Sequence, residues 1–462
     1  MLKGLDINIK QFNELNNADL RIEAEFYQKK YVKLIQLLNN HKCVNLSELV
    51  SKPIQTGHTP SMSNSSFYGG TIKFIKTDNL RVNEICPPFA NYLTKLGNDE
   101  IKRTELQAND IITTIIGATY SVIGRSCIIH EDILPANINQ NIAHIRPDRN
   151  KILPEYLNVY LNSKYGKLFL EYLSRQMEQV NLNCNEVGMV KVPIFTDMFQ
   201  KTIETKVKSA YSKKTESTQL YAAAENQLLE ELGLKGWQPK NDNINVKTLK
   251  ESFLSSGRLD AEYYQSKYED IEKRLMQFKK VDMLGNLCRI NTDNVIPQTG
   301  KFYQYIELAN IKTNGEISGC TFDLGENLPT RARQVVRENQ VIVSSIEGSL
   351  QSCALVPKEY DGAFCSTGFY VVQSGSINSE TLLILLKLNP IQQLFRKACS
   401  GTILTGMNYE QFSNILLPFP DKTIQDDISA KIQKSFALKA ESKRLLEEAK
   451  MMVEKEIEKG GE

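Results

Sequence analysis

Apolar side chains recur at spacings of mostly four residues between residues 198 and 234. This spacing places them on one face of a helix, no proline interrupts the segment, and Gly233 stands where the helix is expected to end. The last part of the chain repeats the stripe 225 residues later. The two stripes consist of Ile203, Val207, Tyr211, Leu220, Ala224, Leu228 and Leu232, and of Ile428, Ile432, Phe436, Leu445, Ala449, Val453 and Ile457. The pattern predicts two equivalent long helices.

Each of these helices is expected to be about 50 Å long, because about 36 residues rise roughly 1.5 Å each. That length exceeds the diameter of a typical small domain, so a helix with a single apolar stripe needs a partner along its length. Its twin is the partner that the sequence favours, which predicts a paired helical spacer. The alternative is that each helix packs only on its own domain.

A second repeat indicates that the whole chain is duplicated. Residues Arg21–Tyr31 return as Arg258–Tyr268 with seven of eleven positions identical, and Ile7–Lys10 returns as Ile244–Lys247 at the same offset of 237. Further matches pair Gln55–Gly57 with Gln298–Gly300, Phe74–Leu80 with Tyr305–Ile311, Thr113–Gly117 with Ser344–Gly348 and Val190–Phe195 with Ile415–Pro420. The offset drifts from 237 to 225, which indicates changes of loop length. So long a period predicts two copies of a whole domain, related by an approximate two-fold axis.

The segments between the predicted long helices contain short strand-like runs. These runs are Ile72–Ile75, Asp110–Ile116, Cys127–Ile129, Ile342–Ile346 and Tyr370–Val372. Shorter helices are expected at Pro154–Leu173 and Ser379–Phe395, and at Leu20–Leu38 and Arg258–Phe278. The mixture predicts the α+β fold class, with segments 1–40, 41–197, 198–280, 281–421 and 422–462.

The composition is that of a globular protein of two to four domains, with 24% charged residues in a chain of 462. The 56 basic and 54 acidic residues give a net charge of +2, so any basic surface for nucleic acid must be local. The longest apolar runs, Ile111–Ile116 and Leu382–Leu386, are too short to cross a membrane, and Met1–Asp6 does not begin a signal segment. We therefore expect a cytoplasmic protein. The nine cysteines are scattered, which fits buried thiols better than disulfides or a metal site.

Catalytic motifs are missing from the sequence. It contains neither a phosphate-binding Gly-x-x-x-x-Gly-Lys-Ser/Thr loop nor His-Glu-x-x-His, and its four histidines do not stand at ligand spacing. Cys86–Phe89 lacks the Asn or Asp of an amino-methyltransferase tetrad, and the nuclease-like pairs at Asp148 and Asp421 fit charged turns. A non-catalytic protein that binds two targets is the function these features favour.

Several weak motifs follow one another in order along the two copies: Gly57-His-Thr-Pro60, Phe74–Asn79 and Tyr305–Asn310, Asn139–Asn141, Ser366–Phe369, and the proline exits followed by Gln200 or Gln425. Their order resembles that of the specificity subunit of Type I restriction–modification enzymes. The resemblance implies two target recognition domains of mixed, mostly antiparallel strands, 41–197 and 281–421, each binding half of a bipartite DNA site. They would be separated by long antiparallel paired helices. Methyltransferase subunits, two in number, and restriction subunits would dock on the chain, and S-adenosylmethionine and ATP would bind to those partners rather than to this chain.

Side chains suited to DNA are arginine or lysine for guanine and for phosphate, and asparagine or glutamine for adenine. In the first domain we expect DNA contacts from Lys52, Gln55, His58, Thr59, Lys73, Lys76, Arg81, Tyr120, Ser121 and Arg125. In the second domain we expect them from Gln298, Lys301, Tyr303, Lys312, Arg331, Arg333 and Gln351. Asn79 and Asn310 are instead expected to form turns, and Arg21 and Arg258 to pair with Glu25 and Glu262 four residues along a helix.

The second copy departs from the pattern, because Gln298–Gly300 is followed by Lys301–Tyr303 without Thr-Pro. This predicts a shorter early loop and different contacts in the second domain. Two alternatives stay open: a specificity protein of a Type IIB-like or orphan methyltransferase system, and a coiled-coil adaptor without a nucleic-acid role. The near-neutral charge favours the adaptor slightly, and the two large domains with unequal polar loops count against it.

Overall fold

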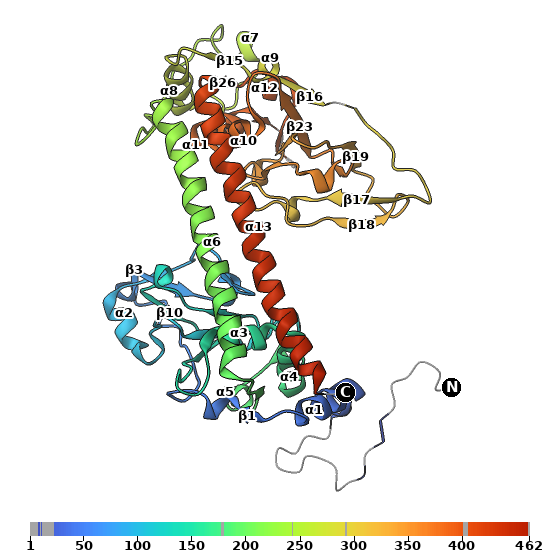
Figure 1. The fold of residues 1–462 in the computed structure, drawn as a ribbon. Coiled ribbons are helices and arrows are strands. Elements are labelled where there is room, and N and C mark those ends of the chain that lie inside the picture. The colour runs from blue at the N-terminus through green and yellow to red at the C-terminus, as the bar shows by residue number, and fades with distance from the viewer. Residues whose placement is uncertain are drawn as a thin grey trace. The chain divides into compact units, whose positions relative to one another are not determined.

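The computed structural model describes residues 8–9, 11, 23–176, 180–242, 244–291, 293–400 and 405–460. The chain forms two compact units, residues 1–213 with 441–462 and residues 214–440. The long helices α6 (Asp197–Glu231) and α13 (Lys422–Lys459) contribute to both units. Figure 1 shows them in green and red.

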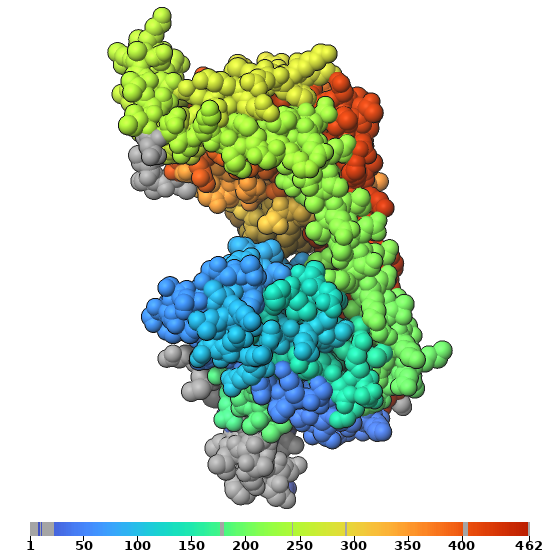
Figure 2. All heavy atoms as spheres, turned by 90° about the vertical axis from the view of Figure 1, so that its left-hand side faces the viewer, coloured from blue at the N-terminus to red at the C-terminus, as the bar shows by residue number. Residues whose placement is uncertain are grey.

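The first unit also contains helices α1 (Lys29–Asn39), α2 (Lys95–Glu100), α3 (Pro154–Asn162), α4 (Lys164–Leu173) and α5 (Cys184–Gly188). Its strands are β1 (Cys43–Asn45), β2 (Gln55–Thr56), β3 (Tyr68–Ile75), β4 (Leu80–Arg81), β5 (Glu84–Ile85), β6 (Tyr92–Leu93), β7 (Ile111–Thr114), β8 (Ile116–Gly117), β9 (Ser126–Ile128), β10 (Ala136–Ile138), β11 (Ile142–Ile145), β12 (Arg175–Gln176), β13 (Val180–Asn181) and β14 (Lys191–Pro193). Figure 2 shows the blue and teal surface of this unit, to which β3 and α2 belong.

The second unit contains helices α7 (Phe253–Ser256), α8 (Ser266–Leu275), α9 (Leu284–Leu287), α10 (Ser379–Lys387), α11 (Asn389–Ala398) and α12 (Tyr409–Ser413). Its strands are β15 (Val281–Met283), β16 (Cys288–Asn291), β17 (Phe302–Ile306), β18 (Thr321–Leu324), β19 (Ala332–Val335), β20 (Val341–Ser344), β21 (Cys353–Leu355), β22 (Phe364–Ser366), β23 (Phe369–Ser374), β24 (Cys399–Ser400), β25 (Gly406–Met407) and β26 (Leu416–Pro418).

Each unit is built around the same four-stranded antiparallel sheet, in the order β2-β11-β7-β9 in the first unit and β16-β23-β20-β21 in the second. All residues of β7 and β20 are buried, which explains their unbroken runs of branched side chains. A neighbouring sheet in each unit contains one parallel pair, β3 with β10 and β17 with β22. The predicted duplication and the α+β class with mostly antiparallel strands are confirmed.

The predicted central helix is confirmed as α6, and Gly233 follows it with a φ of 62°. Five stripe positions of the first unit are buried in one core, namely Ile203, Val207, Ala449, Val453 and Ile457. Five of the second unit are buried in another, namely Ala224, Leu228, Leu232, Ile428 and Ile432. Each stripe therefore packs on the domain cores as well as on the facing helix, so the predicted pairing of the two helices is confirmed and the alternative, that each helix packs only on its own domain, is wrong.

Polar contacts between α6 and α13 establish their direction. In the first unit, Lys206 pairs with Glu448 at 2.8 Å and the Ser442 hydroxyl donates to the Ala210 carbonyl. In the second unit, the Ser435 hydroxyl donates to the Ser217 carbonyl at 2.8 Å. Partner numbers fall along α13 as they rise along α6, so the helices are antiparallel. Ser217 in the first stripe and Ser442 in the second are buried between the apolar positions, where small side chains let the helices approach.

The prediction of helices that begin at Leu20 and Arg258 is wrong. Helix α8 begins only at Ser266, because Gln265 before it has a non-helical backbone, with φ of −59° and ψ of 135°. Arg258 binds Asp260 through two bonds of 2.8 and 2.6 Å rather than Glu262. In the first unit, α1 begins at Lys29 after a 3-10 turn over Ala24–Tyr27, and Leu20 and Arg21 lie outside the described residues.

The two late helices are each divided in two. Pro154–Leu173 breaks at Ser163, whose hydroxyl accepts from the Gly166 amide and so caps α4. Ser379–Phe395 breaks at Leu388, just before Pro390 in the first turn of α11, the position that proline favours.

Candidate nucleic-acid interface

A tight turn joins the two sheets of each unit. It spans residues 139–141 between β10 and β11 in the first unit, and residues 367–368 between β22 and β23 in the second. The Asn141 carbonyl accepts from the Ile115 amide at 3.0 Å, and the Gly368 carbonyl accepts from the Ser345 amide at 2.9 Å. The two turns are thus held by equivalent bonds.

In the first unit, the segment between β2 and β3 lies against this turn. A Cβ on Gly57 would lie 2.0 Å from the Ile138 carbonyl oxygen, so only glycine fits there. The Thr59 hydroxyl donates to the Gln140 side chain at 2.5 Å, and the Tyr68 hydroxyl donates to the Pro60 carbonyl at 2.5 Å. The structure therefore brings Gln55, Thr59 and the exposed His58 together beside the turn.

A buried charged group lies beneath this segment. Asp110 accepts two hydrogen bonds from Arg146 and one from Nε2 of His144, all at 2.7 Å. Burial opposes ionisation of Asp110, but these bonds lower the pKa of its carboxyl below the ordinary value. Burial lowers the pKa of His144, so its imidazole is neutral and donates from Nε2. Since His144 pairs with Gln55 in the sheet, this group fixes the strand that leads into the segment of His58 and Thr59.

Lys52 lies at the edge of the same charged group. Its amine donates to the Arg103 carbonyl at 3.1 Å, and burial together with the charge of Arg146 lowers its pKa. A lysine held in this way contributes positive charge to the surface while it also fixes the backbone around Arg103.

In the second unit, five predicted residues gather around residues 293–303 and β19. The Gln298 amide donates to the Tyr303 hydroxyl at 3.4 Å, and the exposed Lys301 lies in the same turn. The Arg333 carbonyl accepts from the Val295 amide at 2.7 Å, and the Arg331 carbonyl accepts from Thr367 of the tight turn at 2.9 Å. This loop and turn together form the candidate surface of the second unit.

The equivalence predicted for the two Gln-Thr-Gly motifs is wrong. In the first unit, Gln55 of β2 lies opposite His144 of β11. The equivalent position of the second unit, in β16 opposite Val371 of β23, is occupied by Asn291. Gln298 lies seven residues further on, in a loop. Gly57 is packed against backbone, whereas Gly300 has a φ of 77° with open space around it. Glycine is required in both motifs, but for different physical reasons.

The other predicted residues of the first unit lie away from this segment or use their donors internally. Lys73 donates to the Ile133 carbonyl at 3.0 Å, Arg81 to the Asp78 carbonyl at 3.0 Å and Arg125 to the Ser121 carbonyl at 3.0 Å. The remaining three are Lys76, which lies 5.7 Å from the Phe74 ring, Tyr120, which packs on the core, and Ser121, whose hydroxyl contacts Thr119. Arg81 and Arg125 form a second basic group, since burial and the charge of Arg81 lower the pKa of Arg125.

Two predicted residues of the second unit lie elsewhere. Lys312 stands in a turn that its amide closes with the Glu316 carbonyl, and Gln351 offers its carbonyl to Lys387. The structure does not bring either residue to the loop around Lys301. Asn79 and Asn310 form turns as predicted, because the side-chain oxygen of each accepts a hydrogen bond from the main-chain amide three residues earlier in the chain.

Sequence reasoning missed Lys102, Arg103 and Gln140. Lys102 and Arg103 are exposed in a short 3-10 helix that precedes β7, and Gln140 holds Thr59. Phe74 and Tyr305 are 231 residues apart, and the residue 231 positions before Arg333 is Lys102. This offset could therefore have pointed to Lys102 and Arg103.

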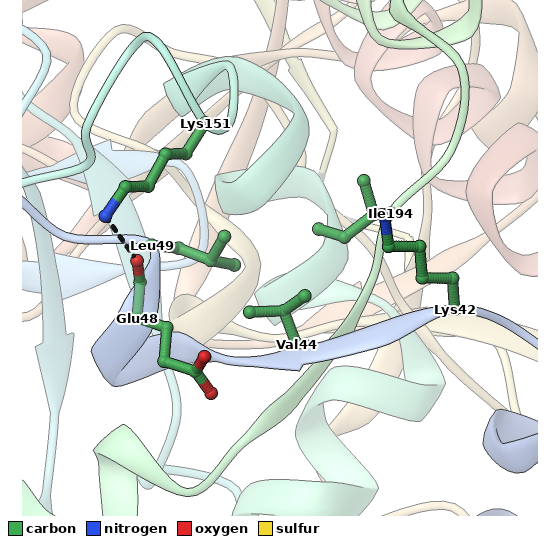
Figure 3. Close-up of a pocket in the computed structure, with 6 residues that line it drawn as sticks. All are labelled: Lys42, Val44, Glu48, Leu49, Lys151 and Ile194. Atoms are coloured by element: carbon green, nitrogen blue, oxygen red, sulfur yellow. Dashed lines mark hydrogen bonds between the residues drawn. The ribbon is translucent and has the colours of Figure 1, made fainter.

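A pocket of about 570 Å³ opens on another part of the first unit (Figure 3). It is lined by Lys42, Val44, Glu48, Leu49, Lys151 and Ile194. Lys151 donates to the Glu48 carbonyl at 2.8 Å, and the aliphatic side chains point toward one another. This lining contains no serine, threonine, cysteine or histidine. Within the described residues there is no cluster of histidine, cysteine or acidic side chains able to hold a metal, nor a helix long and apolar enough to cross a membrane.

Comparison with known proteins supports the resemblance drawn from the sequence. No protein-family profile matches the chain. The chain is 30% identical over 125 residues to the Type I restriction enzyme EcoBI specificity subunit of Escherichia coli. That match spans 26% of this chain and 25% of the relative, so it covers about a quarter of each. The resemblance to Type I specificity subunits is thereby confirmed for this segment.

Three solved structures are similar over 91% of this chain. They are the Type I S subunit from M. genitalium (10% identity, 96% of that chain, TM-score 0.43), a chain from a study of type I R-M complex assembly (16%, 97%, 0.30) and the HsdS subunit from Thermoanaerobacter tengcongensis (14%, 96%, 0.29). Because each TM-score is below 0.5, the curated relative alone supports the resemblance.

Proposed function

We propose that this chain is the DNA-recognition subunit of a Type I restriction–modification system, and that its two domains each bind one half of a bipartite DNA site. The observation that carries the proposal is a shared scaffold whose equivalent turns make different contacts. In the first unit the Gln140 side chain of the turn accepts from the Thr59 hydroxyl, whereas in the second unit the Thr367 amide of the turn donates to the main-chain carbonyl of Arg331. A protein that binds two different half-sites needs equal frames and unequal contacts.

The recognition domains in this proposal are residues 41–197 and 281–421, and the remaining segments form the helical part that joins them. Exposed Lys301 and His58 are suited to groove or phosphate contacts, and Gln55 and Gln298 to adenine. Because the total charge is only +2, we place DNA on these local surfaces rather than on the whole molecule.

The partners in this proposal are two methyltransferase subunits and the restriction subunits. Support comes from the segments that repeat at the constant offset of 237, residues 7–31 and 244–268. Asn8 donates to the Tyr27 carbonyl in the first and Asn245 to the Tyr264 carbonyl in the second, both at 2.7 Å. Beside them, Ile9 and Val246 are 86% and 84% exposed. Figure 2 shows the segment around Val246 and α7, in yellow-green, at the surface of the second unit. Equal apolar surfaces in both copies suit two copies of one partner protein.

Catalysis, S-adenosylmethionine and ATP belong to those partners in this proposal, and the complex works in the cytoplasm. The alternative of a Type IIB-like or orphan system keeps the same role for this chain and changes only the partner. The near-neutral charge favours a coiled-coil adaptor as the alternative from another class.

The test is methylation-aware sequencing of host DNA with and without the gene. Loss of one bipartite methylated motif on deletion is the expected result. An unchanged methylome, while the partner methyltransferase is present and active with another specificity subunit, would contradict the proposal. A motif with a single, uninterrupted target would contradict the two-domain part of it.

A further inference from the structure

Arg103 and Arg333 occupy the same position in the two units, although no sequence motif aligns them. Two backbone hydrogen bonds near Arg103 recur near Arg333, with each donor 230 residues and each acceptor 227 residues further along the chain. The bond from the Leu106 amide to the Ala136 carbonyl (3.1 Å) recurs from Val336 to Ala363 (2.9 Å). The bond from the Asn109 amide to the Ile129 carbonyl (2.8 Å) recurs from Asn339 to Val356 (2.9 Å). Asn109 and Asn339 also share a left-handed backbone, with φ of 72° and 64°. The offset of 230 places Arg103 on Arg333.

The main-chain carbonyl of each arginine accepts one hydrogen bond, although Arg103 lies in a 3-10 helix and Arg333 in β19. The carbonyl of Arg103 accepts from Lys52, and the carbonyl of Arg333 accepts from the Val295 amide. Lys52 and Val295 both belong to the segment that enters the candidate recognition loop of their unit. Each arginine is therefore fixed at its backbone beside that loop, while its side chain is left to point outward.

The side chains of these arginines carry unneutralised charge. Arg103 is exposed and Arg333 is partly exposed, and neither makes a salt bridge with any described residue. Each has a second basic residue nearby in sequence, Lys102 or Arg331, which also lacks such a bridge. By contrast, Arg337 and Arg149 pair with Asp361 and Glu155 at 3.7 and 3.5 Å.

We infer that Arg103 and Arg333 are equivalent DNA-phosphate contacts, one for each half-site; this inference rests on the proposed function. A residue that is the same in two domains with different targets carries no sequence information, so it suits a contact that positions the duplex rather than one that selects bases. The unequal loops beside them, around Thr59 and Lys301, are left to select bases. Arginine is suited to this role because its planar guanidinium binds phosphate through two parallel hydrogen bonds.

The experiment measures DNA binding by the complete chain in complex with its methyltransferase partner, across a range of salt concentrations. The probes are a duplex with the methylated bipartite motif and an unrelated duplex of equal length. We expect Arg103→Ala and Arg333→Ala each to lower the slope of log affinity against log salt by about one on both duplexes, without a change in preference between them. Arg337→Ala and Arg149→Ala are the matched controls, and we expect an unchanged slope for both.

An unchanged slope for Arg103→Ala and Arg333→Ala, with thermal unfolding like that of the unsubstituted complex, would overturn the inference and leave the proposed function intact. A slope that falls only on the specific duplex would also overturn it, since the arginines would then select bases. Failure of the unsubstituted complex to prefer the bipartite duplex would instead reject the proposed function. Arg103→Lys and Arg333→Lys separate charge from structure, because a lysine should restore the slope of each site.

Discussion

Gly57 lies so close to β10 that a Cβ there would be 2.0 Å from the Ile138 carbonyl oxygen. Because both atoms belong to the main chain, Gly57→Ala must displace backbone, and we expect it to lower the free energy of unfolding by about 1–3 kcal/mol. Gly348→Ala is the control, since a Cβ there meets no atom within 4 Å. Urea unfolding followed by circular dichroism measures both. Equal midpoints for the two variants would show that the loop is not held as described.

The neutral state of His144 predicts a pH dependence of stability. Burial lowers its pKa from the ordinary value of 6.5, so the unfolded chain takes up a proton at a higher pH than the folded chain. The stability contributed by the neutral imidazole is complete above about pH 6.5 and is lost as the pH falls from there toward the folded pKa. Asp110, whose pKa is also lowered, loses its contribution at still lower pH.

We therefore expect the urea midpoint to fall between pH 7 and pH 5.5, and His144→Gln to flatten that fall while lowering the midpoint at pH 7.5. His58→Gln is the control, because His58 is exposed. If His144→Gln and His58→Gln gave the same pH profile, the buried group around Asp110 would not be the cause.

Single residues of the interface were predictable only in part. Arginines and lysines beside glycine-bearing loops could be chosen from the sequence because their chemistry suits DNA, and Lys301, Arg331 and Arg333 do gather around one loop. The counterpart Arg103 was missed in this way, because no shared motif aligns it with Arg333; only the offset between the two copies points near it, and backbone hydrogen bonds establish the equivalence. The Gln-Thr-Gly match misled for the opposite reason, since the same three residues occur in two different backbone environments. Gly57 is packed against the main chain of β10, whereas Gly300 has a positive φ in open space.

At the scale of elements, the contact between α6 and α13 in the second unit depends on buried serines. Ser217 and Ser435 are 3% and 1% exposed, and the two hydroxyls lie 3.0 Å apart. We expect Ser435→Ala to cost about 1 kcal/mol through a lost hydrogen bond. Ser435→Leu should cost about 1–3 kcal/mol, because a larger side chain forces the helices apart.

Ser212→Leu serves as the control for Ser435→Leu, because Ser212 is exposed on α6. Thermal unfolding of each variant measures the effect. A Ser435→Leu variant as stable as Ser212→Leu would contradict the close approach of the two helices at this point.

Elements with a long apolar period were predictable, and those set by single polar bonds were not. The stripe from Ile203 to Leu232 predicts α6 because every turn repeats the same pattern. The segment at Arg258 has helix-forming residues, yet the non-helical backbone of Gln265, with ψ of 135°, delays the start of α8 to Ser266. Ser163 divides a predicted helix because its hydroxyl caps the start of α4.

At the scale of the whole molecule, the proposed function gives the chain two domains with equal frames and independent DNA targets. The repeat is strongest where the copies would meet the same partner, at Arg21–Tyr31 and Arg258–Tyr268, and weakest in the loops that would meet different bases. This distribution leads to the expectation that the two targets can be changed one at a time.

Exchange of residues 41–197 for the equivalent domain of a specificity subunit with a different known target tests this most directly. The exchanged chain is expressed with its partner subunits, and the methylated motif is determined by sequencing of the host DNA. We predict that one half of the motif changes to the donor's half-site, while the other half is retained. A motif that changes in both halves, or methylation at the original site by the exchanged chain, would contradict the account.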